Sequence, residues 1–76
     1  MTAITWEEAW KAFKEQTPVE YMARGSQKPI TCTRIAELGM RCDIDGQFRR
    51  FIGAMDKNER CIYHGTLDMF RIPETD

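Results

Sequence analysis

The spacing of apolar residues changes at Pro18, and this change constrains the fold more than any other feature of the chain. Before Pro18, apolar side chains recur at three- and four-residue intervals, at Trp6, Ala9, Trp10 and Phe13. This is the period of an α-helix with one apolar face. After Pro18, apolar and polar residues alternate, which is the period of a β-strand. The sequence therefore predicts a helix that ends before Pro18 and a β-rich segment after it.

The start of the helix is marked by Thr5-Trp6-Glu7-Glu8, which has the form of a capping box. In that motif the Thr5 hydroxyl accepts from the backbone N–H of Glu8, and the Glu8 carboxylate accepts from the backbone N–H of Thr5. We therefore expect a helix over residues 6–15. Its stripe of Trp6, Trp10 and Phe13 is expected to pack on a sheet, with Trp10 largely buried. Truncation of such a side chain costs about 3–5 kcal/mol.

Residues 18–73 predict a β domain of five strands. Strand-like runs cover residues 19–24, 30–42, 47–55, 60–63 and 69–72. The run 30–42 is expected to bend or bulge at Gly39, although residues 36–38 could instead be helical. The run 47–55 has apolar residues at both odd and even positions, so both faces of the predicted strand are apolar. It is therefore covered on both faces, or it carries a bulge near Arg49 and Arg50 that realigns Phe48 with Phe51.

Two acidic segments, residues 43–46 and 56–59, lie between the predicted strands. Asp43-Ile44-Asp45-Gly46 resembles the start of a calcium loop, but the calcium pattern needs Gly at position six and Glu at position twelve. This chain has neither at those positions, whereas Asp and Gly are the residues that tight turns require. We therefore expect two turns without a bound ion, with Arg49 and Arg50 straddling the strand between them.

These elements predict a single α+β domain over residues 1–76, with an N-terminal helix packed on a five-stranded antiparallel meander. The strand order, with a 3₁₀-like turn before the last strand, resembles an SH3-like small barrel over residues 18–73. The helix of residues 5–15 and the run of residues 43–61 together resemble small uncharacterised proteins encoded by phages and prophages. That resemblance implies an accessory protein that works by binding.

The composition argues against a nucleic-acid-binding, a membrane-spanning and a secreted protein. The 76 residues include 11 Lys+Arg and 12 Asp+Glu, a net charge of −1, and a dedicated nucleic-acid binder usually carries a basic excess. No apolar run approaches the roughly 18 residues of a membrane span, and the first ten residues lack the pattern of a signal peptide. The three cysteines favour free thiols and a cytoplasmic protein.

A few residues bear on zinc binding and on catalysis. Cys61-Ile62-Tyr63-His64 has the C-x₂-H spacing of zinc ligands, which Cys32 and Cys42 could complete. Nine residues separate Cys32 from Cys42, which does not match a paired zinc knuckle, so packed thiols are favoured and no metal or cofactor is predicted. The chain has one histidine and none of the common catalytic motifs, so no enzymatic activity is predicted.

The sequence is most consistent with a small non-enzymatic module that binds an unknown protein partner or a second copy of itself. Arg, Tyr and Trp are enriched at binding hot spots, so the candidate residues are Arg49, Arg50, Tyr63 and Trp6. Charge reversal at both arginines is expected to weaken binding while leaving stability nearly intact. The alternative is a nucleic-acid-binding small β-barrel, with Arg34, Arg41, Arg49, Arg50, Phe48 and Tyr63 as its basic aromatic face.

Overall fold

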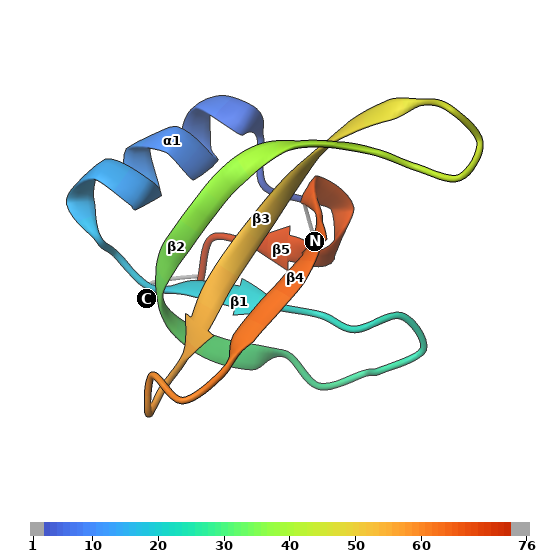
Figure 1. The fold of residues 1–76 in the computed structure, drawn as a ribbon. Coiled ribbons are helices and arrows are strands. Elements are labelled where there is room, and N and C mark those ends of the chain that lie inside the picture. The colour runs from blue at the N-terminus through green and yellow to red at the C-terminus, as the bar shows by residue number, and fades with distance from the viewer. Residues whose placement is uncertain (1–2, 74–76) are drawn as a thin grey trace.

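The computed structural model describes residues 3–73 and contains one helix and a five-stranded antiparallel sheet (Figure 1). The predicted α+β class, with a helix packed on a sheet, is confirmed. The elements are α1 (Trp6–Glu15), β1 (Val19–Tyr21), β2 (Ile30–Cys42), β3 (Phe48–Asp56), β4 (Ile62–Thr66), the 3₁₀ helix η1 (Leu67–Met69) and β5 (Phe70–Arg71).

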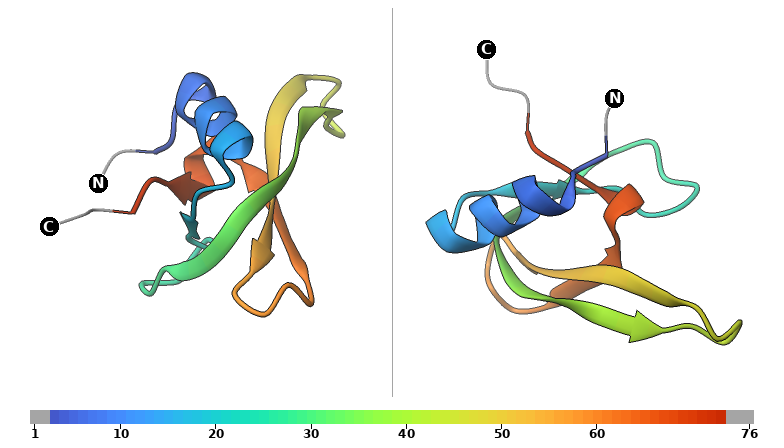
Figure 2. Two further views of the ribbon diagram at one scale, coloured as in Figure 1. Left: turned by 90° about the vertical axis from the view of Figure 1, so that its left-hand side faces the viewer. Right: turned by 90° about the horizontal axis from the view of Figure 1, so that it is seen from above.

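The strands lie in the order β4-β3-β2-β1-β5. The first four strands are therefore sequential neighbours, as in a meander, whereas β5 returns to pair with β1 at the opposite edge. η1 carries the chain from one side of the molecule to the other, and the sheet is not closed between β4 and β5. Figure 2 shows how strongly the strands curve, with α1 lying across the concave side.

α1 begins and ends as predicted. The Glu8 N–H donates to Thr5 Oγ1 at 3.1 Å, and the Thr5 N–H donates to Glu8 Oε1 at 3.0 Å, which completes the capping box. At the other end Gln16 takes a left-handed conformation with φ 55°. Its backbone N–H donates to the carbonyls of Ala12 and Phe13 in the last turn. Local chemistry alone therefore accounts for the length of this helix.

α1 buries only part of the predicted stripe, since Ala9 is buried and Phe13 is half-buried against the core. Ala9 and Ala12 are the buried helix residues, whereas Trp10 is 42% exposed, so the expectation of a largely buried Trp10 is wrong. Short alanine side chains let the helix approach the sheet closely, and the large rings are displaced to the rim. There Trp10 packs edge-on against Trp6 and Phe13, at ring-centroid distances of 6.0 and 5.7 Å.

β2 is bent by two irregularities in its pairing with β3. Two residues of β2 face one residue of β3 between Cys32 and Arg34, and again between Ile35 and Glu37. Each extra residue reverses the alternation of side chains, so Cys32, Ile35 and Leu38 all face the core at a spacing of three. The bulge expected at Gly39 is therefore misplaced, and residues 36–38 are strand rather than helix.

From Phe51 to Asp56 the side chains of β3 are buried or half-buried on both faces, whereas residues 48–50 are exposed. Its register with β2 is continuous from Ile52 to Phe48, so the alternative of a bulge near Arg49 and Arg50 is wrong. Ile52 and Ala54 are buried in the core. Phe51 lies on the outer face, where the Arg41 guanidinium sits 4.7 Å from its ring centroid and Gly39 leaves space for the ring.

Both acidic segments form turns, as predicted. In the first, Gly46 has φ 81° and donates to the Asp43 carbonyl at 2.9 Å, and the Gln47 N–H donates to Asp45 Oδ1 at 3.0 Å. In the second, the Asp56 carboxylate accepts from the Arg60 N–H at 2.7 Å. In these turns aspartate side chains accept hydrogen bonds from backbone N–H groups that have no partner in a neighbouring strand.

The core lies between α1 and the concave side of the sheet. Val19, Cys32, Ile35, Ile52, Ala54 and Phe70 are fully or almost fully buried, together with Ile4, Ala9 and Ala12. The N-terminal segment joins this core because the Ile4 N–H donates to the Phe70 carbonyl at 2.9 Å. Residues far apart in the sequence thus share one small core.

The contrast between Ile52 and Trp10 gives a stability prediction. Ile52→Ala should lower the free energy of unfolding by about 2–5 kcal/mol, because it removes a fully buried side chain. Trp10→Ala should cost clearly less, since that ring already lies partly in water. Urea denaturation of both variants tests this difference. An equal or larger loss for Trp10→Ala would mean that the helix packs through its tryptophans.

The turn at Asp56 predicts a dependence of stability on acid. The Arg60 backbone N–H, which donates to the carboxylate, lowers the pKa of Asp56. A lowered folded-state pKa stabilises the fold above the unfolded pKa of about 4, and this contribution is lost as the pH falls through the folded pKa. Asp56→Asn should therefore flatten the decline of stability below about pH 4. An unchanged slope in denaturation at several pH values would contradict this.

Candidate functional site

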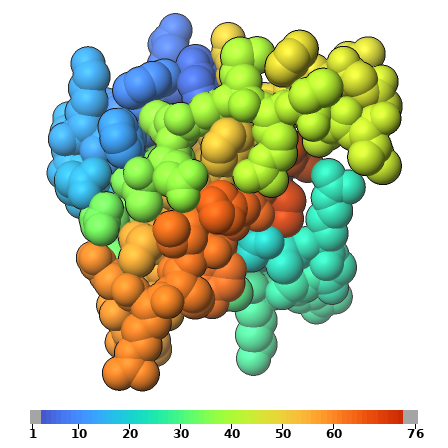
Figure 3. Space-filling view, in the orientation of Figure 1, coloured from blue at the N-terminus to red at the C-terminus, as the bar shows by residue number. Residues whose placement is uncertain are grey.

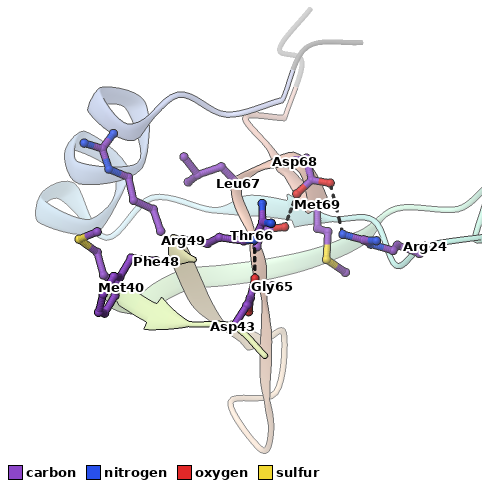
Figure 4. Close-up of a pocket in the computed structure, with 11 residues that line it drawn as sticks. Arg24, Met40, Asp43, Phe48, Arg49, Gly65, Thr66, Leu67, Asp68 and Met69 are labelled. Carbon is purple, nitrogen blue, oxygen red and sulfur yellow. Dashed lines mark hydrogen bonds and ion pairs between the residues drawn. The ribbon is translucent and has the colours of Figure 1, made fainter. Parts of the chain in front are cut away.

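An open groove of about 910 Å³ lies beside the free end of the β2–β3 hairpin (Figure 4). The hairpin contributes Met40, Asp43, Phe48, Arg49 and Arg50 to its lining. The segment that follows β4 contributes residues 65–69, and Arg24 enters from the loop between β1 and β2. Three separate parts of the chain therefore meet around this space.

The groove exists because β4 is shorter than the strand beside it. β4 pairs with β3 only from Met55 to Phe51, where Phe51 faces Thr66. After Thr66 the chain turns into η1, whereas β3 and β2 continue together to the turn at residues 43–46. The end of the hairpin consequently projects from the body, as Figures 1 and 3 show for the yellow-green segment. Residues 48–50 of β3 pair with β2 alone.

Large apolar side chains are exposed on the hairpin end. Phe48 is 69% exposed and Met40 is 62% exposed. The register places Met40 opposite Arg50 and Cys42 opposite Phe48, so these four residues share one face. Leu67 and Met69 of η1 line the groove from the other side and pack against the core. The groove thus combines exposed apolar side chains with a partly buried apolar wall.

Arg49 and Arg50 straddle β3, as predicted, and their environments differ. Arg49 forms salt bridges with Asp43 and Asp45, at 3.0 Å to Asp45 Oδ2, so two carboxylates neutralise it. The Gln47 N–H and the Arg49 guanidinium lower the pKa of Asp45. Arg50 lies on the other face, where its guanidinium sits 5.0 Å from the Trp6 ring centroid. Among residues 3–73 it makes no salt bridge.

The predicted site residues are only partly brought together. Arg50 and Trp6 are in contact, although they come from β3 and α1. Tyr63 lies apart from them, because it pairs with Ala54 and stacks on Tyr21 with ring centroids 5.0 Å apart. Sequence reasoning missed Met40, Leu67 and Met69. Only the strand register and the turn at Thr66 bring these three to the groove, so no local pattern could have identified them.

The four weak zinc candidates do not meet. Cys32 and Cys42 lie at opposite ends of β2, roughly 30 Å apart at the usual rise of a strand. Cys32 is buried, whereas Cys42 and Cys61 are exposed. His64 lies on the outer face, where its Nε2 is 3.3 Å from Glu37 Oε1. Within the described part of the chain, no group of three or more His, Cys, Asp or Glu residues could hold a metal ion.

No family model, no curated protein and no solved structure shows significant similarity to this chain. In the range 3–73, no helix has the length and apolar character needed to cross a membrane.

The three cysteine thiols should differ in their reactivity, because Cys32 is buried and the other two are exposed. Burial, and secondarily the nearby Asp56 carboxylate, raises the pKa of the Cys32 thiol to about 11. At pH 8 a disulfide reagent such as DTNB should therefore modify Cys42 and Cys61 quickly, and Cys32 only after denaturant is added. The Cys42→Ser/Cys61→Ser double variant is the control and should show no fast phase. Fast modification of that variant would mean that Cys32 is accessible.

Proposed function

We propose that this protein is a small non-enzymatic module that binds another protein through the groove beside the β2–β3 hairpin. The observation that carries the proposal is the exposure of Phe48 and Met40, 69% and 62%, beside Arg50 on one face. Aromatic residues, methionine and arginine are enriched in protein interfaces. Neighbouring exposed apolar side chains rimmed by polar groups are typical of binding sites.

Arg50 adds a feature that recurs at binding hot spots. Its guanidinium stacks on Trp6, which holds the side chain in place while the N–H groups at its edge stay available. A preorganised arginine loses less conformational entropy on binding than a free one. Trp6 and Arg50 therefore form a polar anchor next to the apolar pair of Phe48 and Met40.

The proposal includes an SH3-like arrangement of the strands and an accessory role of the phage or mobile-element type. The 3₁₀ helix η1 before the last strand supports the first part, although the sheet stays open between β4 and β5. The resemblance of the opening helix to phage and prophage proteins supports the second part. A cytoplasmic location belongs to the same proposal and rests on the free cysteines.

Nucleic-acid binding is the second candidate, since Phe48 and Arg50 together resemble a stacking platform with a cation beside it. Two features of the groove favour a protein instead. Arg49 is neutralised by Asp43 and Asp45, and the carboxylates of Asp43 and Asp68 line the same space. Phosphate groups would meet these carboxylates directly.

The proposal is tested by capture from the lysate of the native host. Wild-type protein should retain a specific partner, and both Phe48→Ala and Arg50→Glu should reduce its capture severalfold, because they alter the exposed anchors. Arg41→Glu is the matched control: it reverses an arginine on the outer face, over Phe51, and should leave capture unchanged. Circular dichroism should show that all three variants fold.

Equal capture by wild type, Phe48→Ala and Arg50→Glu would overturn this assignment of the surface. A heparin column separates the second candidate, because a protein-binding module should elute at low salt. Retention to high salt that is lost in Arg50→Glu would favour nucleic acid.

A further inference from the structure

We infer that the groove receives an extended, acidic segment of a partner protein, which adds as a strand to the open edge of β3 at residues 48–50. This inference rests on the proposed function and specifies how the partner docks. It follows from three features of the groove: an unpaired backbone edge, apolar side chains beside that edge, and Arg50, which has no carboxylate partner among residues 3–73.

The backbone edge is the first feature. A strand directs its N–H and C=O groups to both sides, and residues 48–50 have a neighbouring strand, β2, on one side only. The other side of β3 is occupied by β4 as far as Phe51 and is then open. An added strand would continue the line of β4 for three residues, roughly 10 Å. Edge strands with unpaired groups are templates for such pairing.

The side chains specify the chemistry of the segment. Phe48 and Arg50 point to the same face, since they are two residues apart on β3. Residues two apart on an added strand would lie beside them on that face. The position next to Phe48 favours an apolar side chain, and the position next to Arg50 favours a carboxylate. We therefore expect an apolar and an acidic residue separated by one residue in the partner.

A second copy of this chain fits the same edge poorly. Symmetric antiparallel pairing centred on Arg49 would place Arg49 opposite its counterpart and Arg50 opposite Phe48 of the other copy. Each Arg50 would then face an apolar ring and gain no carboxylate, whereas Arg49 is already paired with Asp43 and Asp45. A strand that places a carboxylate next to Arg50 therefore complements this edge better than a second copy does.

Single-stranded nucleic acid fits poorly for a different reason. An open strand edge presents backbone donors and acceptors in alternation, whereas a phosphate backbone supplies acceptors. Nucleic acid also carries a phosphate at every nucleotide, so some would face Asp43 and Asp68, whereas the peptide needs only one carboxylate, placed at Arg50. A polypeptide strand is the ligand that satisfies both kinds of backbone group.

Selection from a display library of random decapeptides tests the inference, with the full-length protein as immobilised target. The enriched peptides should carry an acidic and an apolar residue two positions apart. One of them, labelled with fluorescein, is then measured by fluorescence anisotropy. Arg50→Glu should weaken it roughly tenfold, and replacing its acidic residue with Lys should restore binding to that variant. Arg41→Glu should bind like wild type.

The strand geometry has its own readout in the peptide backbone. N-methylation of alternate amides blocks the hydrogen bonds on one side of an extended segment. One methylated set should abolish binding, and the complementary set should bind nearly as well as the parent peptide. Equal effects of the two sets, or binding that is indifferent to Arg50→Glu, would overturn strand addition at this edge.

The remaining outcomes separate this inference from the proposed function. If no peptide is enriched while lysate capture still depends on Phe48, the protein is a binding module that docks its partner in another way. If it instead forms a dimer that Phe48→Ala disrupts, the occupant is a second copy. Either result rejects the acidic strand. Failure of both peptide binding and lysate capture rejects the proposed function as well.

Discussion

The bend in β2 is the constraint on which the rest of the structure depends. β2 pairs with β1 at its beginning and with β3 along most of its length, and α1 packs against it. The two irregularities in its register turn Cys32, Ile35 and Leu38 to one side. A strand of 13 residues with strict alternation would present these three residues to both faces. The bend gives a short chain one concave face on which to gather a core.

The same strand carries the candidate site at its other end. Beyond Leu38 the alternation of β2 is regular, and Met40 and Cys42 continue the core-facing row past the point where α1 and β5 can cover it. Because β4 ends at Thr66, nothing in the described chain covers the edge of β3 at residues 48–50. The buried core and the candidate site thus lie at opposite ends of one hairpin.

α1 links the two ends. Ala9 and Ala12 hold it close to the sheet, and this close approach displaces Trp6 and Trp10 to its rim. Trp6 then reaches Arg50 across the surface and positions its guanidinium. The helix therefore contributes to the core through its smallest side chains, and through Trp6 it contacts Arg50 of the groove.

The elements that local chemistry dictates could be predicted from the sequence. The capping box at Thr5, the helix that ends before Pro18 and the turns at residues 43–46 and 56–59 each depend on neighbouring residues, and the structure has all of them. Strand formation over residues 30–42 followed from β-branched residues, and over residues 47–55 from the turns on either side of that run. The positions of Arg49 and Arg50 on opposite faces followed from the same period.

Only the tertiary structure decided which side of each element is buried and which distant residues meet. The stripe of Trp6, Trp10 and Phe13 overlaps the alanine face of the helix, and periodicity cannot tell which of the two fits against a curved sheet. The bulges in β2 depend on pairing with β3, and the position of β5 beside β1 depends on η1. The groove arises from non-local pairing, because it exists only where β4 stops short of the hairpin end. The sequence by itself therefore determined the parts of this protein, and the packing of β2 determined its surface.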